Sequence, residues 1–477
     1  MSLPRALALA LLAALGAPAA SRAQQPAACS LPGAHAAPPP AWHRGAVVYG
    51  VVPPLFDADR PLRGVTARLG ALAALGVDVL WLAPVTDTDD RGHISYAVTD
   101  YLKLRPDYGT PADLSALVAG AHARGIKVLL DVVPNHTSVA HPLYRDAERR
   151  GRASPSWALY ARDEDGKVRH DFDWAHLPKL DHRNPEVRRM LTRALVHWVE
   201  RYDVDGFRVD AAWGPQAADP TFWPELVQAV RRVKPAALLV AEASARDPAY
   251  IAEGFDAAYD WTGELGHWAW EGVFEDPAHA GPKLDAALGA GGTPPDRVLR
   301  FLDNNDTGDR FVTRHGAALT RAAAALVHAL PGLAVIYTGE EVGAAYRPYD
   351  DGPPVRWGDD PLRLRPHYAR LAALRERLPA LRDGAYRRAP VEGNEGAFAF
   401  VRDAGTAGYA VVVANLGEAA TVRVALPIEP GEAPTWDAVG GRPVPARLVG
   451  PSTLELELPA RTAVILVPAP GCAGAAR

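Results

Sequence analysis

The sequence predicts an α/β fold: a (β/α)8 TIM barrel with a small insertion after the third strand and a C-terminal all-β sandwich. Short apolar runs recur eight times between residues 47 and 337. Helix-like stretches separate several of these runs, with proline or aspartate at many starts and glycine after several ends. Apolar strands that alternate with helices indicate a parallel sheet buried on both faces, and eight such units are typical of a closed barrel.

The limits of the expected elements follow from this pattern. The helix-like stretches cover residues 66–75, 111–124, 185–201 and 220–233. The barrel strands are expected at residues 47–52, 77–82, 126–133, 204–209, 237–241, 257–259, 297–302 and 333–337.

Two regions depart from this alternation. Residues 137–184 form a long polar connection after the third strand, and loops of that length in a compact domain are usually functional. We therefore expect a small inserted subdomain at the barrel mouth. Over residues 385–470, strand-like segments with Gly and Pro turns follow one another without helices, which predicts a separate β-sandwich. The barrel itself is expected to span residues 46–384.

The two ends of the chain have compositions of their own. Residues 1–23 contain Arg5, an apolar run and a final group of small residues, which is typical of a secretory signal peptide cleaved after Ala23. The run is too short to span a bilayer, so no stable membrane insertion is expected. A Pro- and Ala-rich lead covers residues 24–45, and a short tail covers residues 471–477. These features predict a periplasmic or extracellular protein.

The chain has two cysteines, Cys29 and Cys472. In an oxidising compartment they favour a disulfide between the two ends of the chain, and two unpaired thiols are the alternative. A lipid anchor on Cys29 is a weaker alternative to signal-peptide cleavage after Ala23, because that cysteine lies far from the apolar run. The net charge of -5 and the pI of about 6.3 provide no basic surface for a phosphate backbone, which argues against nucleic acid as a partner.

Charged side chains stand at the ends of four expected strands, where a TIM barrel places its active site. The fourth strand carries Arg208 and Asp210, which share one face because side chains alternate along a strand. A carboxylate beside a guanidinium is expected to stay ionised, which suits a nucleophile. Glu242 ends the apolar fifth strand, so desolvation should raise its pKa, as a general acid requires. The seventh strand leads to Asp306 and the third to His136.

A structural explanation competes with a catalytic one for each of these groups. A single acid at the end of a strand is more often a helix N-cap or an ion-pair partner than a catalytic group. Three acids, an arginine and a histidine at the ends of four different strands are harder to explain in that way. Cleavage of a glycosidic bond uses two carboxyl groups across that bond, and a third acid can bind ring hydroxyls.

The motifs around these groups keep a fixed order along the chain. The four barrel motifs are Asp131–His136 (DVVPNH), Gly206–Asp210 (GFRVD), Val240–Glu242 (VAE) and Phe301–Asp306 (FLDNND). Three further segments accompany them: Tyr96–Tyr101 (YAVTDY), Leu177–Pro185 (LPKLDHRNP) and Pro331–Glu340 (PGLAVIYTGE). This ordered set, from about residue 47 to residue 467, resembles the alpha-amylase family of glycoside hydrolases.

The resemblance implies a retaining mechanism with a covalent glycosyl-enzyme intermediate. Asp210 would be the nucleophile, Glu242 the general acid/base and Asp306 the stabiliser of the transition state. The nucleophile and the acid/base carboxyl groups of such an enzyme lie about 5–5.5 Å apart. The resemblance also implies that Arg208 orients the nucleophile, His136 bonds a glycone hydroxyl and Tyr96 stacks beneath the sugar ring.

Some positions of the substrate site depart from the family pattern. Asn305 stands where the family usually has His, and its amide can donate a hydrogen bond but carries no charge. Ile94 stands where amylases usually have another His, and the adjacent His93 is expected to be an ordinary surface or core residue. Trp213 and Gly214 stand where amylases commonly have Lys and His. The indole of Trp213 either offers a stacking face to an acceptor sugar or packs under the next loop.

A further departure concerns metal. Amylases with a structural calcium use the Asn of the first motif, an Asp after the Leu-Pro pair and the carbonyl at the position of Gly214. Asn135 is present, but Lys179 stands at the Asp position. Calcium needs several oxygen ligands and an ammonium repels it, so we expect no metal cofactor and a Lys179 ammonium in the cation's place near Asn135.

These observations predict a hydrolase that cleaves α-glucosidic bonds in starch-derived oligosaccharides or related α-glucosides. A transglycosylase or isomerase of the same family is one alternative, because water and sugar hydroxyls compete for the same intermediate. A non-catalytic carbohydrate-binding relative is another, in which Asn305 and Ile94 would be signs of lost activity. The three acids argue against the second alternative, since loss of function is expected to affect them too.

Overall fold

The computed structural model describes residues 43–469, other than 290 and 351. The expected signal peptide (residues 1–23), Cys29 and Cys472 lie outside the described residues, so export, lipidation and the disulfide stay predictions. Across residues 43–469, with those two gaps, no helix is long and apolar enough to cross a membrane.

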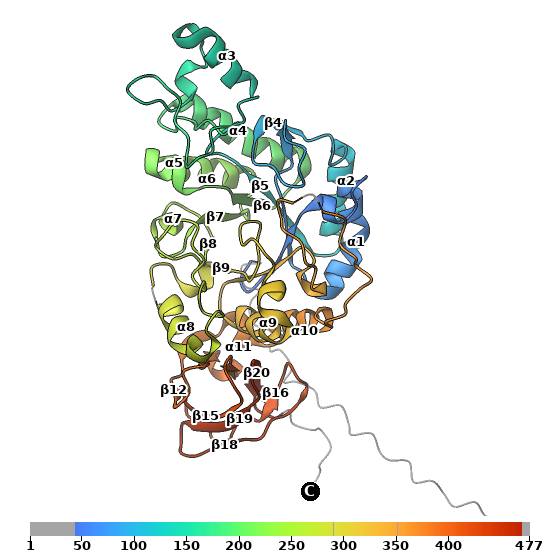
Figure 1. Cartoon of the computed structure of the whole chain (residues 1–477), viewed down its shortest axis with the longest axis vertical. Helices are drawn as coiled ribbons and strands as arrows, with labels where there is room; N and C mark the ends of the chain where they lie inside the picture. Colours follow the sequence, from blue (N-terminus) through green and yellow to red (C-terminus); the bar gives the residue numbers. More distant parts are fainter. Residues whose placement is uncertain (1–42, 290, 351, 470–477) are drawn as a thin grey trace, which may run out of the picture. The chain divides into compact units, whose positions relative to one another are not determined.

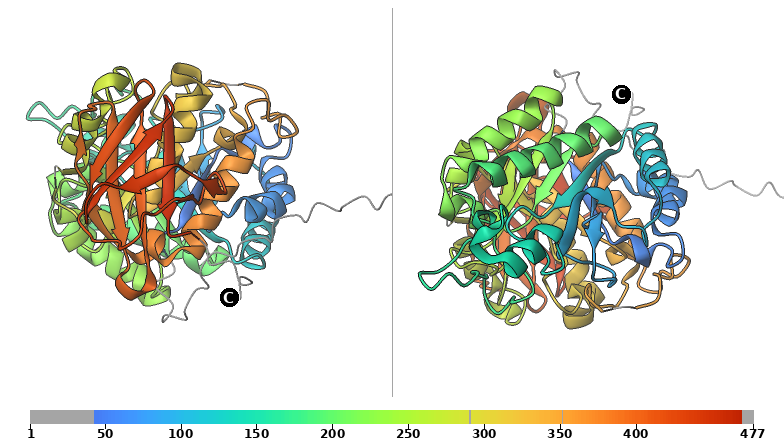
Figure 2. Two further views of the ribbon diagram at one scale, coloured as in Figure 1. Left: turned by 90° about the horizontal axis from the view of Figure 1, so that it is seen from below. Right: turned by 90° about the horizontal axis from the view of Figure 1, so that it is seen from above.

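Eight parallel strands close into a barrel, as the sequence predicted (Figure 1). The strands follow one another around the barrel in the order β1, β2, β5, β6, β7, β8, β9, β10, and β10 pairs with β1. Helices lie around the outside of these strands (Figure 2). The barrel strands are β1 (Val47–Val51), β2 (Val79–Leu82), β5 (Lys127–Val132), β6 (Gly206–Val209), β7 (Leu238–Ser244), β8 (Ala257–Tyr259), β9 (Val298–Arg300) and β10 (Leu333–Tyr337).

The helices begin and end at residues that favour those positions. In α2, Thr110 and Asp113 form a reciprocal capping box around Pro111 at the first position. α1 begins at Pro61, five residues before the expected start, and ends before Gly76, whose φ of 89° suits a left-handed cap. The α-helices are α1 (Pro61–Leu75), α2 (Pro111–His122), α3 (Pro142–Arg150), α4 (Pro185–Tyr202), α5 (Trp213–Ala218), α6 (Phe222–Val233), α7 (Ala249–Ala252), α8 (Ala280–Gly289), α9 (Phe311–Ala329), α10 (Arg365–Arg377) and α11 (Pro379–Asp383).

Two segments at the carboxyl ends of the strands extend the barrel. The connection between β5 and α4 contains α3 and two 3-10 turns, and isolated bridges such as His136 to Lys179 tie it to itself. A two-stranded hairpin, β3 (Thr86–Thr88) with β4 (Val98–Leu104), lies between β2 and α2. The sequence pattern did not predict this hairpin. The 3-10 turns are η1 (Pro53–Leu55), η2 (Gly151–Ala153), η3 (Trp157–Leu159), η4 (Pro277–His279), η5 (Pro295–Arg297), η6 (Glu340–Val342) and η7 (Gly405–Ala407).

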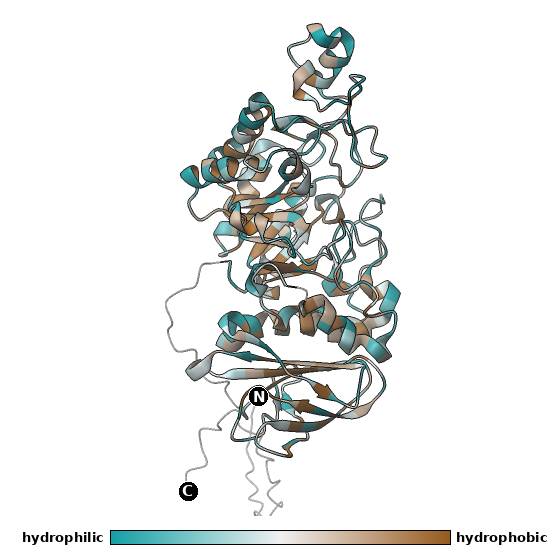
Figure 3. Cartoon of the chain, turned by 90° about the vertical axis from the view of Figure 1, so that its left-hand side faces the viewer, coloured by the Kyte–Doolittle hydropathy of each residue, from teal (hydrophilic) through white to brown (hydrophobic). Residues whose placement is uncertain are grey.

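The C-terminal region forms two antiparallel sheets, as predicted. Apolar side chains from both sheets form one buried core, and hydrophobic colouring follows many of the strands in Figure 3. Arg402 links this region to the barrel helices by donating a hydrogen bond of 2.7 Å to the Ala329 carbonyl. The strands are β11 (Ala385–Arg388), β12 (Val391–Glu392), β13 (Ala397–Asp403), β14 (Tyr409–Asn415), β15 (Ala420–Ala425), β16 (Trp436–Asp437), β17 (Arg442–Pro443), β18 (Ala446–Leu448), β19 (Thr453–Leu458) and β20 (Thr462–Val467).

One glycine controls how closely two central strands approach. Gly206 of β6 pairs with Leu238 of β7 and has a φ of 147°. A Cβ atom at residue 206 would lie 1.9 Å from the Leu238 carbonyl oxygen. Glycine is therefore required both for the backbone conformation and for the strand contact.

Candidate active site

Three carboxyl groups meet in one cavity at the carboxyl ends of the barrel strands. Asp210 follows β6, Glu242 lies in β7 and Asp306 follows β9. All three line a cavity of about 530 Å³, which we call the acidic cavity. Parallel strands end at the same edge of a barrel, and this is why residues from distant parts of the sequence come together here. The convergence that the sequence suggested is present in the structure.

Arg208 lies at the centre of this group and is 1% exposed. Its Nη1 donates to Asp131 at 2.8 Å and to Asp210 at 3.1 Å. Its Nη2 lies 2.7 Å from Glu242 Oε1 in an ionic contact that is not aligned as a hydrogen bond. Its Nε donates to the Tyr259 hydroxyl at 3.0 Å. One guanidinium therefore serves three carboxyl groups.

Burial changes the protonation of the nucleophile candidate, Asp210. Burial raises the pKa of Asp210 to about 7, with further increases from Asp131 and Asp306, and Arg208 opposes the shift. This raised pKa opposes the expectation that Asp210 stays ionised beside a guanidinium, and that expectation stays a prediction for the pH profile to test. Burial also raises the pKa of Glu242 well above its ordinary value, as expected for a group that must hold a proton. Each acid is nearly excluded from water, which disfavours its charged form.

Asp131 connects the arginine to the side chain of Tyr96. The Tyr96 hydroxyl donates to Asp131 at 3.0 Å, and Trp81 Nε1 donates to the same carboxylate at 3.1 Å. The sequence analysis gave Asp131 no role of its own, although an acid inside an apolar strand was a visible signal. Its 1% exposure places it beneath the cavity, where it holds Tyr96 and Arg208 together.

His136 and Tyr96 both line the acidic cavity. His136 Nε2 lies 3.2 Å from the Tyr96 carbonyl oxygen, which can only accept, so this nitrogen carries the proton. His136 Nδ1 then accepts from the Asn135 amide at 3.3 Å. Burial lowers the pKa of His136 to about 4, so the ring is neutral at pH 7. Both ring nitrogens have protein partners, and a bond to a sugar hydroxyl requires His136 to exchange one of them.

Asn305 and Asp306 share a partner that the sequence analysis did not identify. The Asn305 amide donates to the Tyr349 hydroxyl at 3.0 Å. That hydroxyl lies 3.0 Å from Asp306 Oδ1. Tyr349 lies in a loop after β10 without periodicity or a motif, so no sequence signal pointed to it.

Aromatic side chains surround the mouth of the acidic cavity. Trp213 lines it, and Phe172 packs edge-on against Trp213 with ring centroids 5.9 Å apart. Phe172 and Trp174 lie 4.9 Å apart and are 62% and 39% exposed. The described residues include six large exposed hydrophobic side chains, and four of these line the cavity: Phe172, Trp174, Leu265 and Tyr349. An exposed apolar group of this kind commonly marks a binding site.

The turn that carries Phe172 and Trp174 is fixed by a charged clamp. Lys179 Nζ donates to Asp171 Oδ1 at 2.7 Å, and the Asn135 amide donates to Asp171 Oδ2 at 2.7 Å. Lys179 therefore reaches Asn135 through Asp171, a residue that the sequence analysis did not weigh. Among the described residues, no group of three or more His, Cys, Asp or Glu side chains has the arrangement of a metal site.

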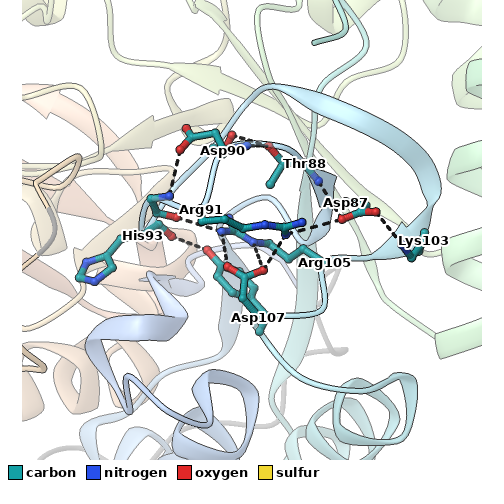
Figure 4. A network of polar contacts seen from close by, with 11 residues as sticks. Asp87, Thr88, Asp90, Arg91, His93, Lys103, Arg105 and Asp107 are labelled. Carbon is teal, nitrogen blue, oxygen red and sulfur yellow. Dashed lines mark hydrogen bonds and ion pairs between the residues drawn. The ribbon is translucent and has the colours of Figure 1, made fainter. Parts of the chain in front are cut away.

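Ile94 lines the cavity wall, and the neighbouring His93 does not. The loop that carries them is held by Arg105, which is 0% exposed and donates to the Gly92 carbonyl at 2.9 Å and to Asp107 at 2.6 Å. Figure 4 shows the His93 ring directed away from the Arg105 and Asp107 side chains. The one-place offset therefore does not bring a histidine to the position of Ile94.

Comparison with known proteins agrees with this geometry. Residues 57–253 match the family model for the alpha amylase catalytic domain. The alpha-amylase MalA of Haloarcula japonica is 31% identical over 397 residues, which cover 81% of this chain and 58% of that protein. The chain belongs to the alpha-amylase family. Neopullulanase 2 of Thermoactinomyces vulgaris is 28% identical over 456 residues, which cover 85% of the chain and 75% of that protein.

Solved structures of the same fold extend the comparison. The noncanonic maltogenic alpha-amylase AmyB of Thermotoga neapolitana superposes with a TM-score of 0.73 at 20% identity, over 88% of this chain and 98% of that one. This likeness concerns the fold. The chain spans less than two thirds of the length of the Haloarcula japonica relative.

Proposed function

We propose that this chain is a retaining glycoside hydrolase that cleaves α-glucosidic bonds in starch-derived oligosaccharides or related α-glucosides. The observation that carries the proposal is the convergence of Asp210, Glu242 and Asp306 in one cavity. The names of its relatives, alpha-amylase and neopullulanase among them, support an α-glucan substrate.

In the proposed reaction, Asp210 attacks the anomeric carbon while Glu242 gives its proton to the oxygen of the leaving group. A covalent glycosyl ester on Asp210 results. Glu242, now ionised, removes a proton from water, and that water displaces Asp210 from the same face that the leaving group occupied. The configuration of the anomeric carbon is therefore retained. Both carboxyl groups touch the same guanidinium of Arg208, which supports the short separation expected of a retaining pair.

The remaining cavity residues have supporting roles in this proposal. Arg208 orients Asp210, and Asp306 binds sugar hydroxyls as the ring flattens towards the oxocarbenium-like transition state. The Tyr96 ring is held by Asp131 in a position to stack beneath that sugar. His136 is neutral, so it acts as a hydrogen-bonding group and not as a charged one.

Transfer to a sugar acceptor is a second candidate activity, and the aromatic mouth of the cavity favours it. Flat rings such as those of Phe172, Trp174 and Trp213 can stack on an acceptor sugar and hold it where water would otherwise attack. Maltotriose as sole substrate separates the two activities. Transfer yields products longer than the substrate, whereas hydrolysis yields only shorter ones.

We also propose that the chain holds no structural calcium. The residues do not fit that ion, because the Lys179 ammonium already neutralises Asp171 and the Asn135 amide directs its N–H at the same carboxylate. Calcium binding would require both donors to move and a cation to approach an ammonium. Calcium content measured after extensive dialysis tests this proposal, and one tightly held ion per chain would contradict it.

A turnover assay on a chromogenic maltooligoside tests the main proposal. Asp210→Asn should lower kcat on the order of a thousandfold or more, because it removes the nucleophile. Glu341→Gln is a matched control, since it also neutralises a buried acid but lies outside the acidic cavity. Sugar binding without turnover by the unmodified protein, on a panel of α-glucans and α-glucosides, would instead support a non-catalytic carbohydrate-binding protein.

A further inference from the structure

Tyr349 lies over the acidic cavity and contacts one of its acids directly. Its side chain lines the cavity and is 50% exposed, while its hydroxyl lies 3.0 Å from Asp306 Oδ1. A large aromatic side chain that is half exposed needs a reason to stay in one position. The contacts of its hydroxyl group with Asn305 and Asp306 supply that reason.

The three side chains form a hydrogen-bonded chain with one direction. Ionised Asp306 can only accept, so the single hydroxyl proton of Tyr349 must be donated to it. The Tyr349 oxygen is then left to accept from Asn305 Nδ2 at 3.0 Å. This fixes the orientation of the Asn305 amide as well. The asparagine that replaces the usual histidine of the family therefore donates to a tyrosine of this chain.

The loop that carries Tyr349 is attached at two residues that precede it. Tyr346 donates from its hydroxyl to the Thr338 carbonyl at 2.7 Å. Arg347 donates to Asp309 at 2.7 Å, and Asp309 belongs to the same loop as Asp306. The loops after β9 and β10 are thus joined at two places, through Arg347 and through Tyr349 itself.

We propose that Tyr349 is a positioning residue, which holds the Asp306 carboxylate in the orientation that receives the sugar hydroxyls. This inference rests on the proposed function. Tyr349 contacts Oδ1 of Asp306, and Glu242 and Asn305 also interact with this carboxyl group. Asn305 contacts the Tyr349 hydroxyl as well, so the asparagine and the tyrosine position Asp306 together.

The charge of Asp306 provides a readout that a purely structural role would not change. Asp306 faces Arg208, Glu242, Asp210 and Tyr349. Burial raises its pKa, and the hydrogen bond from Tyr349 is one of the interactions that lower it. Without the hydroxyl, Asp306 becomes harder to ionise. The part of the acidic limb that reports ionisation of Asp306, beside the part set by Asp210, should then move to higher pH.

Tyr349→Phe tests the proposal because it removes one oxygen atom and keeps the ring. We expect kcat to fall about 10- to 100-fold, the range for a hydrogen bond to a charged group, with a smaller change in KM. The acidic limb of kcat/KM should shift upwards. Tyr346→Phe is the matched control, because it removes a hydroxyl from the same loop without touching the acids, and it should leave both quantities near those of the unmodified enzyme.

A double-mutant cycle with Asn305→Leu completes the test. If Asn305 and Tyr349 position Asp306 together, the loss in the double variant should be smaller than the sum of the two single losses. Additive losses, or a Tyr349→Phe enzyme with unchanged or higher kcat and an unmoved pH profile, would overturn the proposal. Inactivity of the unmodified protein on every α-glucoside would instead remove the proposed function itself.

Discussion

The acidic cavity and the loops after β9 and β10 each contain buried acids close to an arginine. In the second group, which we call the sealed acid cluster, Asp303, Glu340 and Glu341 are 1%, 2% and 3% exposed, and Arg310 forms an ion pair with Asp303. Tyr49 donates to Glu341 at 3.0 Å, and Arg310 lies 3.5 Å from Asp303. None of these side chains lines the acidic cavity.

The comparison separates a perturbed acid from a functional one. Burial raises the pKa of Glu340 to about 8 and that of Glu341 to about 7, and it raises the pKa of Asp210 to about 7 as well. The shifts are alike, so they do not reveal which cluster performs chemistry. Access does, because a substrate can reach Asp210 through an open cavity and meets only packed tyrosines around Glu341. Perturbed protonation is a sign of function only where it occurs beside a binding space.

The largest effect should come from Glu242, the proposed acid/base in the acidic cavity. Glu242→Gln is expected to lower kcat on unactivated maltooligosaccharides by about 10²- to 10⁴-fold, because no proton is supplied to the leaving oxygen. Aryl glycosides with acidic phenol leaving groups need less protonation and should lose less activity. Kinetics on both substrate types measure this difference. Equal losses on both would contradict the assignment of Glu242 as the proton donor.

The next effect to expect is a pH dependence of activity that the raised pKa values of the acidic cavity produce. Asp210 must be ionised to attack, and its pKa is raised to about 7. Activity should therefore increase as the pH rises through about 7, and it should fall again where Glu242, whose pKa burial raises well above its ordinary value, loses its proton. A profile of kcat/KM against pH is the measurement. An acidic limb near pH 4 would mean that Arg208 keeps Asp210 ionised after all.

The sealed cluster should govern stability and not activity. A carboxyl whose pKa is higher in the folded than in the unfolded protein binds protons more tightly when folded, so stability falls as the pH rises between the two values. For Glu341 that window runs from 4.5 to about 7, and the loss is on the order of 3 kcal/mol. Glu341→Gln should weaken the fall of Tm between pH 5 and pH 8. An unchanged slope would show that this acid does not drive the dependence.

The smallest effect should come from the aromatic side chains at the mouth of the acidic cavity. Trp213→Ala is expected to raise KM for maltotriose and longer substrates by about 2- to 10-fold, the range for loss of one aromatic contact. A monoglucosyl aryl substrate, which does not reach the outer rings, should show little change. If both substrates respond equally, Trp213 supports the fold of the loop and does not bind an acceptor sugar.

The barrel and the position of its acids were predictable because both leave local marks. Each strand is a continuous apolar run, and Asp210 and Glu242 interrupt such runs at their ends. The C-terminal strand β19 carries an equally clear mark, the alternation of apolar and polar residues over Thr453–Leu458. The hairpin β3–β4 is different, because its mixed residues have no clean period and its position depends on contacts with Arg105 and Asp107.

The parts of the site that the sequence did not predict depend on contacts between residues far apart in the chain. The pKa of Asp210 depends in part on the Arg208 guanidinium, which also contacts Asp131 and Glu242, and no pattern in the sequence records these contacts. Tyr349 and Phe172 lie in loops, where side-chain direction follows the path of the backbone and not a sequence period. Asn305 was recognised as a departure from the family, but its partner became visible only in the structure.

The close contact between Gly206 and Leu238 has a consequence for how the enzyme tolerates change. Asp210 lies four residues after Gly206 on one strand, and Glu242 lies four residues after Leu238 on its neighbour. A methyl group at residue 206 would push these strands apart at their base, and the displacement would pass along both to the reacting groups. The separation of the proposed nucleophile and the proposed acid/base therefore depends on a position that lies outside the acidic cavity.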